Sequence, residues 1–230
     1  MKRGKYTILI LVITASIIVF LLLNLLLGSV SIPFASVWNI LTGGEGDPVA
    51  WQNIILKSRL PQALTALVAG AGLSISGLQM QTIFRNPLAG PSVLGISSGA
   101  SLGVAFVVLL SGQLGGVALS RLGFIGEVAL SIAAIAGALS VMGLIVLASR
   151  KVAGSVTLLI IGVMIGYIAN AVIGVLKFFS VEEDIKAYVI WGLGSFARVS
   201  GNQMMLFVTI MAVIIPLSFL LIKPLNLLML

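Results

Sequence analysis

Long stretches without a charged residue dominate the chain, and they predict membrane-spanning helices. Each stretch exceeds the roughly 20 residues that an α-helix needs to cross a hydrocarbon core of about 30 Å. None shows the alternation of polar and apolar residues that is typical of membrane β-barrel strands. The charge-free runs cover residues 6–44, 60–84, 86–120, 128–149, 152–176 and 199–222. The pattern predicts six spanning helices, at approximately 7–28, 60–84, 88–111, 124–149, 153–176 and 202–222.

The first run is too long for one helix, so its second half predicts an extramembrane segment. GSVSIP and TGGEGDP interrupt the apolar pattern, and SVWNIL between them predicts a short helix at the membrane surface. MKRGK followed by an apolar run also resembles a signal peptide. The run is long for such a peptide and no small-residue cleavage site stands out, so we interpret it as an uncleaved first helix.

Composition supports a membrane location and excludes several chemistries. Mean hydropathy is +1.24 and only 8% of the 230 residues are charged, against about 25% in soluble domains. The absence of Cys and His removes disulfides, thiolates and the commonest general base and metal ligand. The net charge of +7 comes from scattered basic residues, which do not form a nucleic-acid-binding patch. We expect an all-α, polytopic membrane protein with one transmembrane domain over residues 1–230.

The basic residues predict a cytoplasmic N-terminus. With that orientation, seven basic residues fall on inside segments and six on outside segments. The inside loops are far shorter, so their basic density is higher, as the positive-inside rule requires. All six acidic residues then lie outside.

Three predicted helices carry small residues at helical spacing. Residues four apart lie on nearly one face, where Gly lets two backbones approach closely. The stripes have two interpretations, helix packing or the lining of a path for a bulky solute. Asn170 favours a path because a lone amide at membrane depth needs a partner or water, although an interhelical hydrogen bond would serve equally. The residues are Gly70, Ser74 and Gly77; Gly95, Gly99 and Gly103; and Gly162, Gly166, Asn170 and Gly174.

A tight turn is predicted between the second and third helices. Pro87 and Pro91 each remove a backbone donor, and Asn86 before Pro87 is biased to an extended conformation. The sequence before and after this turn contains specific motifs. Arg59-Leu60-Pro61, followed by AGAGLSISGLQMQTIFRNPLAGPSVLGISSGASLG at 69–103, closely resembles permease subunits of ABC importers for ferric siderophores, haem and vitamin B12. The resemblance continues through WGLGSF at 191–196 and KPLNLLML at 223–230.

This resemblance implies a type II ABC importer permease fold in the bacterial cytoplasmic membrane. Relatives have about ten transmembrane helices, and a Gly-Glu-containing segment that touches the ATPase follows where this chain stops. We therefore interpret the chain as a partial product, truncated after the sixth helix. The implied partners are cytoplasmic ATPase subunits, a periplasmic or lipoprotein solute-binding protein, a second permease as homodimer or heterodimer, and membrane lipid.

No enzymatic activity is expected of the chain itself. It has no Walker motif, and its glycine-rich stretch lacks the Lys-Ser/Thr of a phosphate loop. The chain is therefore expected to bind no cofactor, and ATP is expected to be used by the partner subunit. Two alternatives remain open: a truncated, non-transporting remnant, and a secondary transporter. The second is disfavoured because the only candidate intramembrane acid, Glu127, lies at a helix end.

The resemblance also implies where the solute-binding protein docks. It places Arg59 at the periplasmic mouth, where an exposed guanidinium can pair with a carboxylate of the binding protein. The alternative is a snorkelling cation that anchors the second helix. Gln62 stands where some relatives carry a second Arg, so Lys57 and Arg198 are further candidates.

A short helix outside the membrane is predicted within EEDIKAYVIWGLGSF at 182–196. Its three leading acids suit a helix N-terminus better than a metal site.

Overall fold

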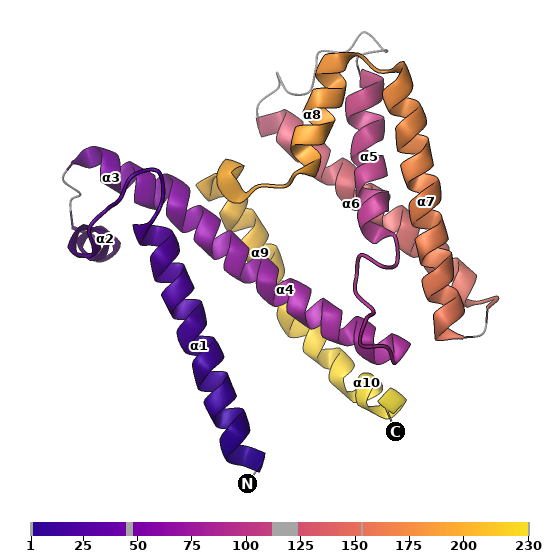
Figure 1. Cartoon of the computed structure of the whole chain (residues 1–230), viewed down its shortest axis with the longest axis horizontal. Helices are drawn as coiled ribbons and strands as arrows, with labels where there is room; N and C mark the ends of the chain where they lie inside the picture. The colour runs from indigo at the N-terminus through magenta and orange to yellow at the C-terminus, as the bar shows by residue number, and fades with distance from the viewer. Residues whose placement is uncertain (1, 45–47, 112–123, 153, 230) are drawn as a thin grey trace. The chain divides into compact units, whose positions relative to one another are not determined.

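The computed structural model describes residues 2–44, 48–111, 124–152 and 154–229, and every regular element in these ranges is helical (Figure 1). Its contacts divide the chain into two compact units. Unit 1 comprises Met1–Gly72 and Phe196–Leu217, and unit 2 comprises Leu73–Ser195 and Ser218–Leu230. The sequence predicted a single transmembrane domain over residues 1–230, whereas the contacts within the chain divide it into these two units.

Unit 1 is built around the end of its first helix. A buried cluster of Leu25, Ile32, Val37, Ile40 and Ile55 holds that helix end against the following turn and a short amphipathic helix. The helix predicted at 36–41 is confirmed within Phe34–Leu41, with Val37 and Ile40 on its buried face, and its location at the membrane surface stays a prediction. The helices of unit 1 are α1 (Lys2–Leu26), α2 (Phe34–Leu41), α3 (Val49–Ile54), the π-helical turn η1 (Ile55–Arg59), the first half of α4 (Leu60–Phe84), η3 (Phe196–Arg198) and α9 (Gly201–Ser218).

Unit 2 is built around one central helix, α5 (Ile96–Ser111), which packs against three neighbours (Figure 1). Its buried residues Val104, Ala105, Val108 and Leu109 form one cluster with Ile173 and Tyr188. The other helices of unit 2 are the second half of α4, α6 (Phe124–Ser149), α7 (Ser155–Phe179), α8 (Glu182–Gly192), η4 (Phe219–Leu221) and α10 (Ile222–Met229).

Five helical stretches are long and apolar enough to cross a membrane. Few of their residues are buried within the chain, so most of their apolar side chains face outward. Such a surface suits a lipid environment. The stretches are Gly4–Leu26, Val49–Phe84, Ile125–Ser149, Ser155–Phe179 and Gly201–Leu228, and they correspond to five of the six predicted spans.

The predicted third span, 88–111, is wrong over its first eight residues. The chain runs through turns there, and α5 begins only at Ile96. Pro87 and Pro91 cannot donate helical hydrogen bonds, and Gly95 has φ +73°, so the helix cannot start earlier. The described part of α5 has 16 residues and is about 24 Å long, less than the roughly 30 Å of a hydrocarbon core.

Three other predicted helices have different bounds. The predicted helix 7–28 is observed as Lys2–Leu26. The predicted helix 153–176 is observed as Ser155–Phe179, and residue 153 itself lies outside the described residues. The predicted helix 202–222 ends at Ser218, shortly after Pro216, but helical structure then continues as η4 and α10 to Met229. A proline inside a helix removes one backbone hydrogen bond and favours such a break.

Candidate functional site

Glycine contacts join α5 to α6. A Cβ placed on Gly99 would lie 2.7 Å from the carbonyl oxygen of Gly137, and one placed on Gly137 would lie 3.0 Å from the Cα of Gly103. Gly103 is equally confined, because its Cβ would meet the Ala133 carbonyl group. The two backbones therefore touch with no room for a side chain, which is how small residues join membrane helices.

A second glycine contact joins the start of α5 to α7. A Cβ on Gly95 would lie 2.5 Å from the Gly162 carbonyl oxygen, and one on Gly162 would lie 2.8 Å from the Cα of Leu94. Gly166 lies beside Ser98, whose hydroxyl oxygen would be 3.3 Å from a Cβ on that glycine. Five of the predicted stripe glycines thus lie in helix contacts, and this geometry supports the packing interpretation for them.

Three stripe glycines, Gly70, Gly77 and Gly174, have no atom close to their Cβ positions. A Cβ on Gly174 would meet no atom within 4 Å, and the Asn170 side chain is exposed. Asn170 and Tyr167 border a cavity of about 270 Å³ within unit 2, between the start of α5 and the middle of α7. The lining of this cavity carries no charged side chain; it consists of Ser92, Val93, Gly95, Ser98, Val163, Gly166, Tyr167 and Asn170. It can offer hydroxyl and amide hydrogen bonds to a neutral or weakly charged solute.

Arg59 is buried, with 7% of its surface exposed. The π-helical turn η1 packs against α1, and the Arg59 guanidinium donates hydrogen bonds to the carbonyl oxygens of Leu25 (2.6 Å), Leu26 (3.1 Å) and Val30. A Cβ on Gly28 would lie 2.7 Å from an Arg59 nitrogen, so a larger residue there would require the guanidinium to shift. Because α1 has no basic residue in its own last turn, Arg59 supplies the cation that its C-terminal carbonyls favour.

This arrangement bears on the docking hypothesis. The prediction that Arg59 docks the solute-binding protein assumed that its guanidinium is exposed. In the structure the guanidinium is buried, so this assumption is wrong. Lys57, two residues earlier, is exposed, whereas Gln62 donates to the Ser58 hydroxyl (2.9 Å). Arg198 lies in η3, and its side chain is outside the described structure. Docking at these cations therefore stays a prediction, with Lys57 the best-placed of the three.

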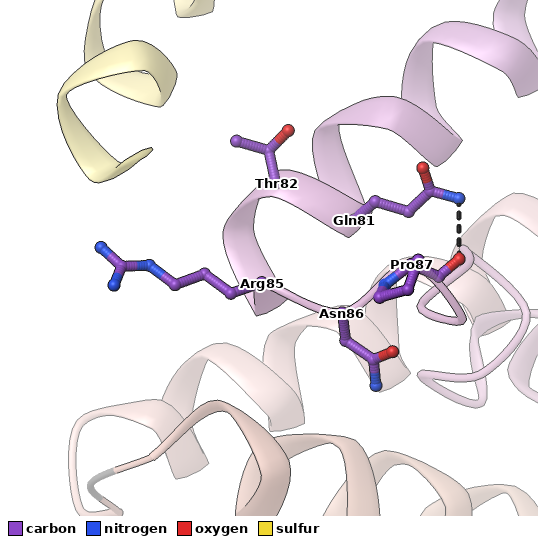
Figure 2. Close-up of a pocket in the computed structure, with 5 residues that line it drawn as sticks. All are labelled: Gln81, Thr82, Arg85, Asn86 and Pro87. Carbon is purple, nitrogen blue, oxygen red and sulfur yellow. Dashed lines mark hydrogen bonds between the residues drawn. The ribbon is translucent and has the colours of Figure 1, made fainter. Parts of the chain in front are cut away.

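The chain turns sharply after α4. Arg85 has φ +47°, and the backbone N–H groups of Arg85 and Asn86 donate to the carbonyls of Thr82 (3.2 Å) and Gln81 (3.1 Å). This is the Schellman arrangement that ends many helices. The Gln81 side chain donates to the Pro87 carbonyl (3.0 Å), as Figure 2 shows. Pro91 lies further along, where turns lead to α5.

The acidic residues of α8 occupy its first turn, as predicted. Burial raises the pKa of the Asp184 carboxyl above its usual range, and the neighbouring Glu183 raises it further. One turn later Tyr188 hydrogen-bonds Ser101, and the Lys177 ammonium lies 4.7 Å from the centre of its ring. These contacts fix α8 against α5 and α7. Among the described residues, no three acidic side chains converge to hold a metal ion.

Sequence reasoning missed Gly28 and Gly137. Gly137 had a usable signal, because Ala133 and Gly137 are small residues four apart in the fourth predicted helix. Gly28 had none, since its partner Arg59 is distant in the sequence.

The helical arrangement matches that of a solved structure, a metal-chelate type ABC transporter in an inward-facing conformation. The TM-score is 0.76 at 28% sequence identity, over 97% of this chain and 65% of the other. The class defined by the fold is thus an ABC transporter permease, a multi-pass membrane protein. Within that class, the chain belongs to the FecCD transport family, whose family model matches residues 16–230.

Curated relatives carry three kinds of name. An iron chelatin transport system permease protein of Helicobacter pylori is 41% identical over 62% of this chain and 39% of its own length. The hemin transport system permease protein HmuU of Yersinia pestis is 32% identical over 78% and 50%. The vitamin B12 import system permease protein BtuC of Salmonella paratyphi A is 36% identical over 74% and 48%. The chain spans about half or less of the length of these relatives.

Proposed function

We propose that the chain forms part of a permease that imports an iron chelate, either a siderophore or haem, or vitamin B12 across the bacterial cytoplasmic membrane. The family match over residues 16–230 carries this proposal, and the shared fold supports it. Transport would proceed by alternating access, with ATP hydrolysed by separate ATPase subunits. A second permease and a solute-binding protein complete the proposed assembly, and the N-terminus lies in the cytoplasm.

Uptake measurements test this function. Cells that lack the chain should lose uptake of one of three labelled solutes: a ferric siderophore, haem or cobalamin. Re-expression of the chain should restore that uptake only when the partner ATPase is active. Unchanged uptake of all three solutes after deletion would identify a non-transporting remnant, and uptake that persists with an inactive ATPase would identify a secondary transporter.

We propose the uncharged cavity beside Asn170 as part of the solute path. Its hydroxyl and amide groups can form weak, reversible contacts with the oxygen-rich surface of a chelate. Replacing Asn170 with Ala is expected to slow ATP-driven uptake by about 2–10-fold, the effect of one lost hydrogen bond. Ile168→Ala on the same helix removes an apolar side chain that is also exposed and should leave uptake unchanged. Equal effects of the two variants would argue against a path at Asn170.

We propose Lys57 as a docking cation for the solute-binding protein. It is exposed beside the clamped Arg59, so a partner carboxylate can reach it. The variant Lys57→Gln is expected to weaken association with the binding protein about two- to fivefold at low salt, and less at high salt, because exposed ion pairs are weak and screened. Lys151→Gln, on a segment predicted to lie inside, is the matched control. An effect that is independent of salt would contradict electrostatic docking at Lys57.

A further inference from the structure

A polar pocket of about 440 Å³ lies at the end of α4, away from the proposed solute path. It is lined by Gln81, Thr82, Arg85, Asn86 and Pro87, all in unit 2 (Figure 2). Figure 2 shows the Arg85 side chain extending away from the turn, while Gln81 points toward Pro87. The pocket therefore combines one exposed cation with neutral polar groups.

The backbone conformation of Arg85 is the first indication that its side chain has a functional role. Arg85 is the only non-glycine residue with positive φ among the described residues, and it occupies the left-handed position of the Schellman motif. Glycine is the favoured residue at that position because any Cβ is strained there. A non-glycine residue at this position therefore points to a role for its side chain.

Some of the side-chain hydrogen-bond donors at the pocket already have partners. The Thr82 hydroxyl donates to the Leu78 carbonyl (2.8 Å), and the Asn86 side-chain oxygen accepts from the backbone N–H of Leu88 (2.9 Å). The Arg85 guanidinium has five N–H donors and, among the described residues, makes one hydrogen bond, to the Leu228 carbonyl. Among the described residues, the donors at the pocket without a partner are therefore on the Arg85 guanidinium and the Asn86 amide nitrogen, with the second N–H of the Gln81 amide beside them.

The position of the pocket indicates what those donors meet. Arg85 immediately follows Phe84, the last residue of the membrane-length stretch Val49–Phe84. A residue directly after a span lies at the depth of the lipid headgroups in either leaflet. Lipid phosphates are abundant at that depth, and a guanidinium binds a phosphate through two parallel hydrogen bonds.

We propose that this pocket binds the phosphate of an anionic phospholipid headgroup, with Arg85 as the cation and the Asn86 amide as a second donor. The proposal depends on the chain being a membrane protein and not on its transported solute. Free phosphate or a nucleotide would offer the same chemistry to Arg85, so the test must separate these sources from lipid.

The test uses the full chain in nanodiscs, with any subunits that copurify. Native mass spectrometry would measure retained lipid after exchange into mixtures of phosphatidylglycerol and phosphatidylcholine. Arg85→Gln and Arg85→Gly are the two variants, and the second also relaxes the backbone, so a folding defect cannot explain its loss of lipid. Arg150→Gln is the matched control, because Arg150 is an exposed cation outside this pocket.

The wild-type chain is expected to retain phosphatidylglycerol preferentially. Both Arg85 variants should bind it roughly tenfold more weakly, the loss of about one charge-assisted hydrogen bond, and Arg150→Gln should bind it normally. Inorganic phosphate or ATP at millimolar concentration should not displace the lipid. The proposal is overturned if Arg85→Gly retains the lipid like the wild type, if Arg150→Gln loses as much, or if free phosphate or ATP displaces the lipid.

Discussion

Replacing Arg59 with Gln is expected to reduce the stability of unit 1 by about 3 kcal/mol. The guanidinium donates to the carbonyls of Leu25, Leu26 and Val30. Its loss removes the donor to the buried Leu25 carbonyl, at about 1–3 kcal/mol, and one donor from each of two part-buried carbonyls, of which that of Leu26 still accepts from the Ile32 N–H (3.4 Å). Lysine should not rescue the variant, because a single ammonium cannot span carbonyls on both sides of the turn. Thermal unfolding in detergent and hydrogen exchange over residues 23–30 would measure the effect.

Gly28→Ala provides a matched test of the same clamp, because it leaves Arg59 intact. The added methyl group would lie 2.7 Å from the guanidinium and should displace it, which should speed hydrogen exchange at the end of α1. Gly4→Ala is the control, since nothing lies within 4 Å of its Cβ position. If Arg59→Gln lowered affinity for the binding protein while hydrogen exchange stayed unchanged, Arg59 would be a docking residue and the clamp interpretation would be wrong.

Replacing Gly137 with Ala is expected to destabilise unit 2 by about 2–3 kcal/mol, the usual effect of overpacking a tight contact. A methyl group there would press on the backbones of Gly99 and Gly103, and backbone cannot move aside as a flexible side chain can. The yield of folded protein in detergent and its thermal unfolding would report the change. Larger side chains should prevent α5 and α6 from packing.

The control for this variant lies on the same helix. Gly143 has no atom within 4 Å of its Cβ position, so Gly143→Ala should be neutral or slightly stabilising, because alanine favours the helix by up to about 1 kcal/mol. If Gly137→Ala were as well tolerated as Gly143→Ala, the close approach of α5 and α6 would be refuted.

Membrane helices could be predicted well here because their signal is local. The predicted helix 60–84 matches α4 at both ends, and 124–149 matches α6 at both ends. A long apolar run must form helix in lipid, since each backbone polar group needs a partner within the segment. The start of α5 was mispredicted because the apolar run continued through Pro87 and Pro91, whose effect on the backbone outweighs hydropathy.

The candidate site was less predictable, because its contacts join distant residues. Stripe glycines could be recognised by spacing, but spacing does not show whether a stripe faces another helix or open space. The structure places Gly99 against α6 and Gly162 against Leu94, and leaves Gly174 open. Arg59 could be recognised by its motif, yet its burial depends on carbonyls about thirty residues earlier in the chain.

The sequence by itself determined that this protein is an all-helical membrane protein of a known transport family. Both conclusions rest on properties that lie within short segments, namely the length of the apolar runs and the sequence motifs. Only the tertiary structure decided which glycines lie between helices, that Arg59 clamps α1, and that Arg85 keeps unused donors at a pocket. The physical reason is that burial and hydrogen bonding depend on which segments meet in space, and hydropathy along one segment does not contain that information.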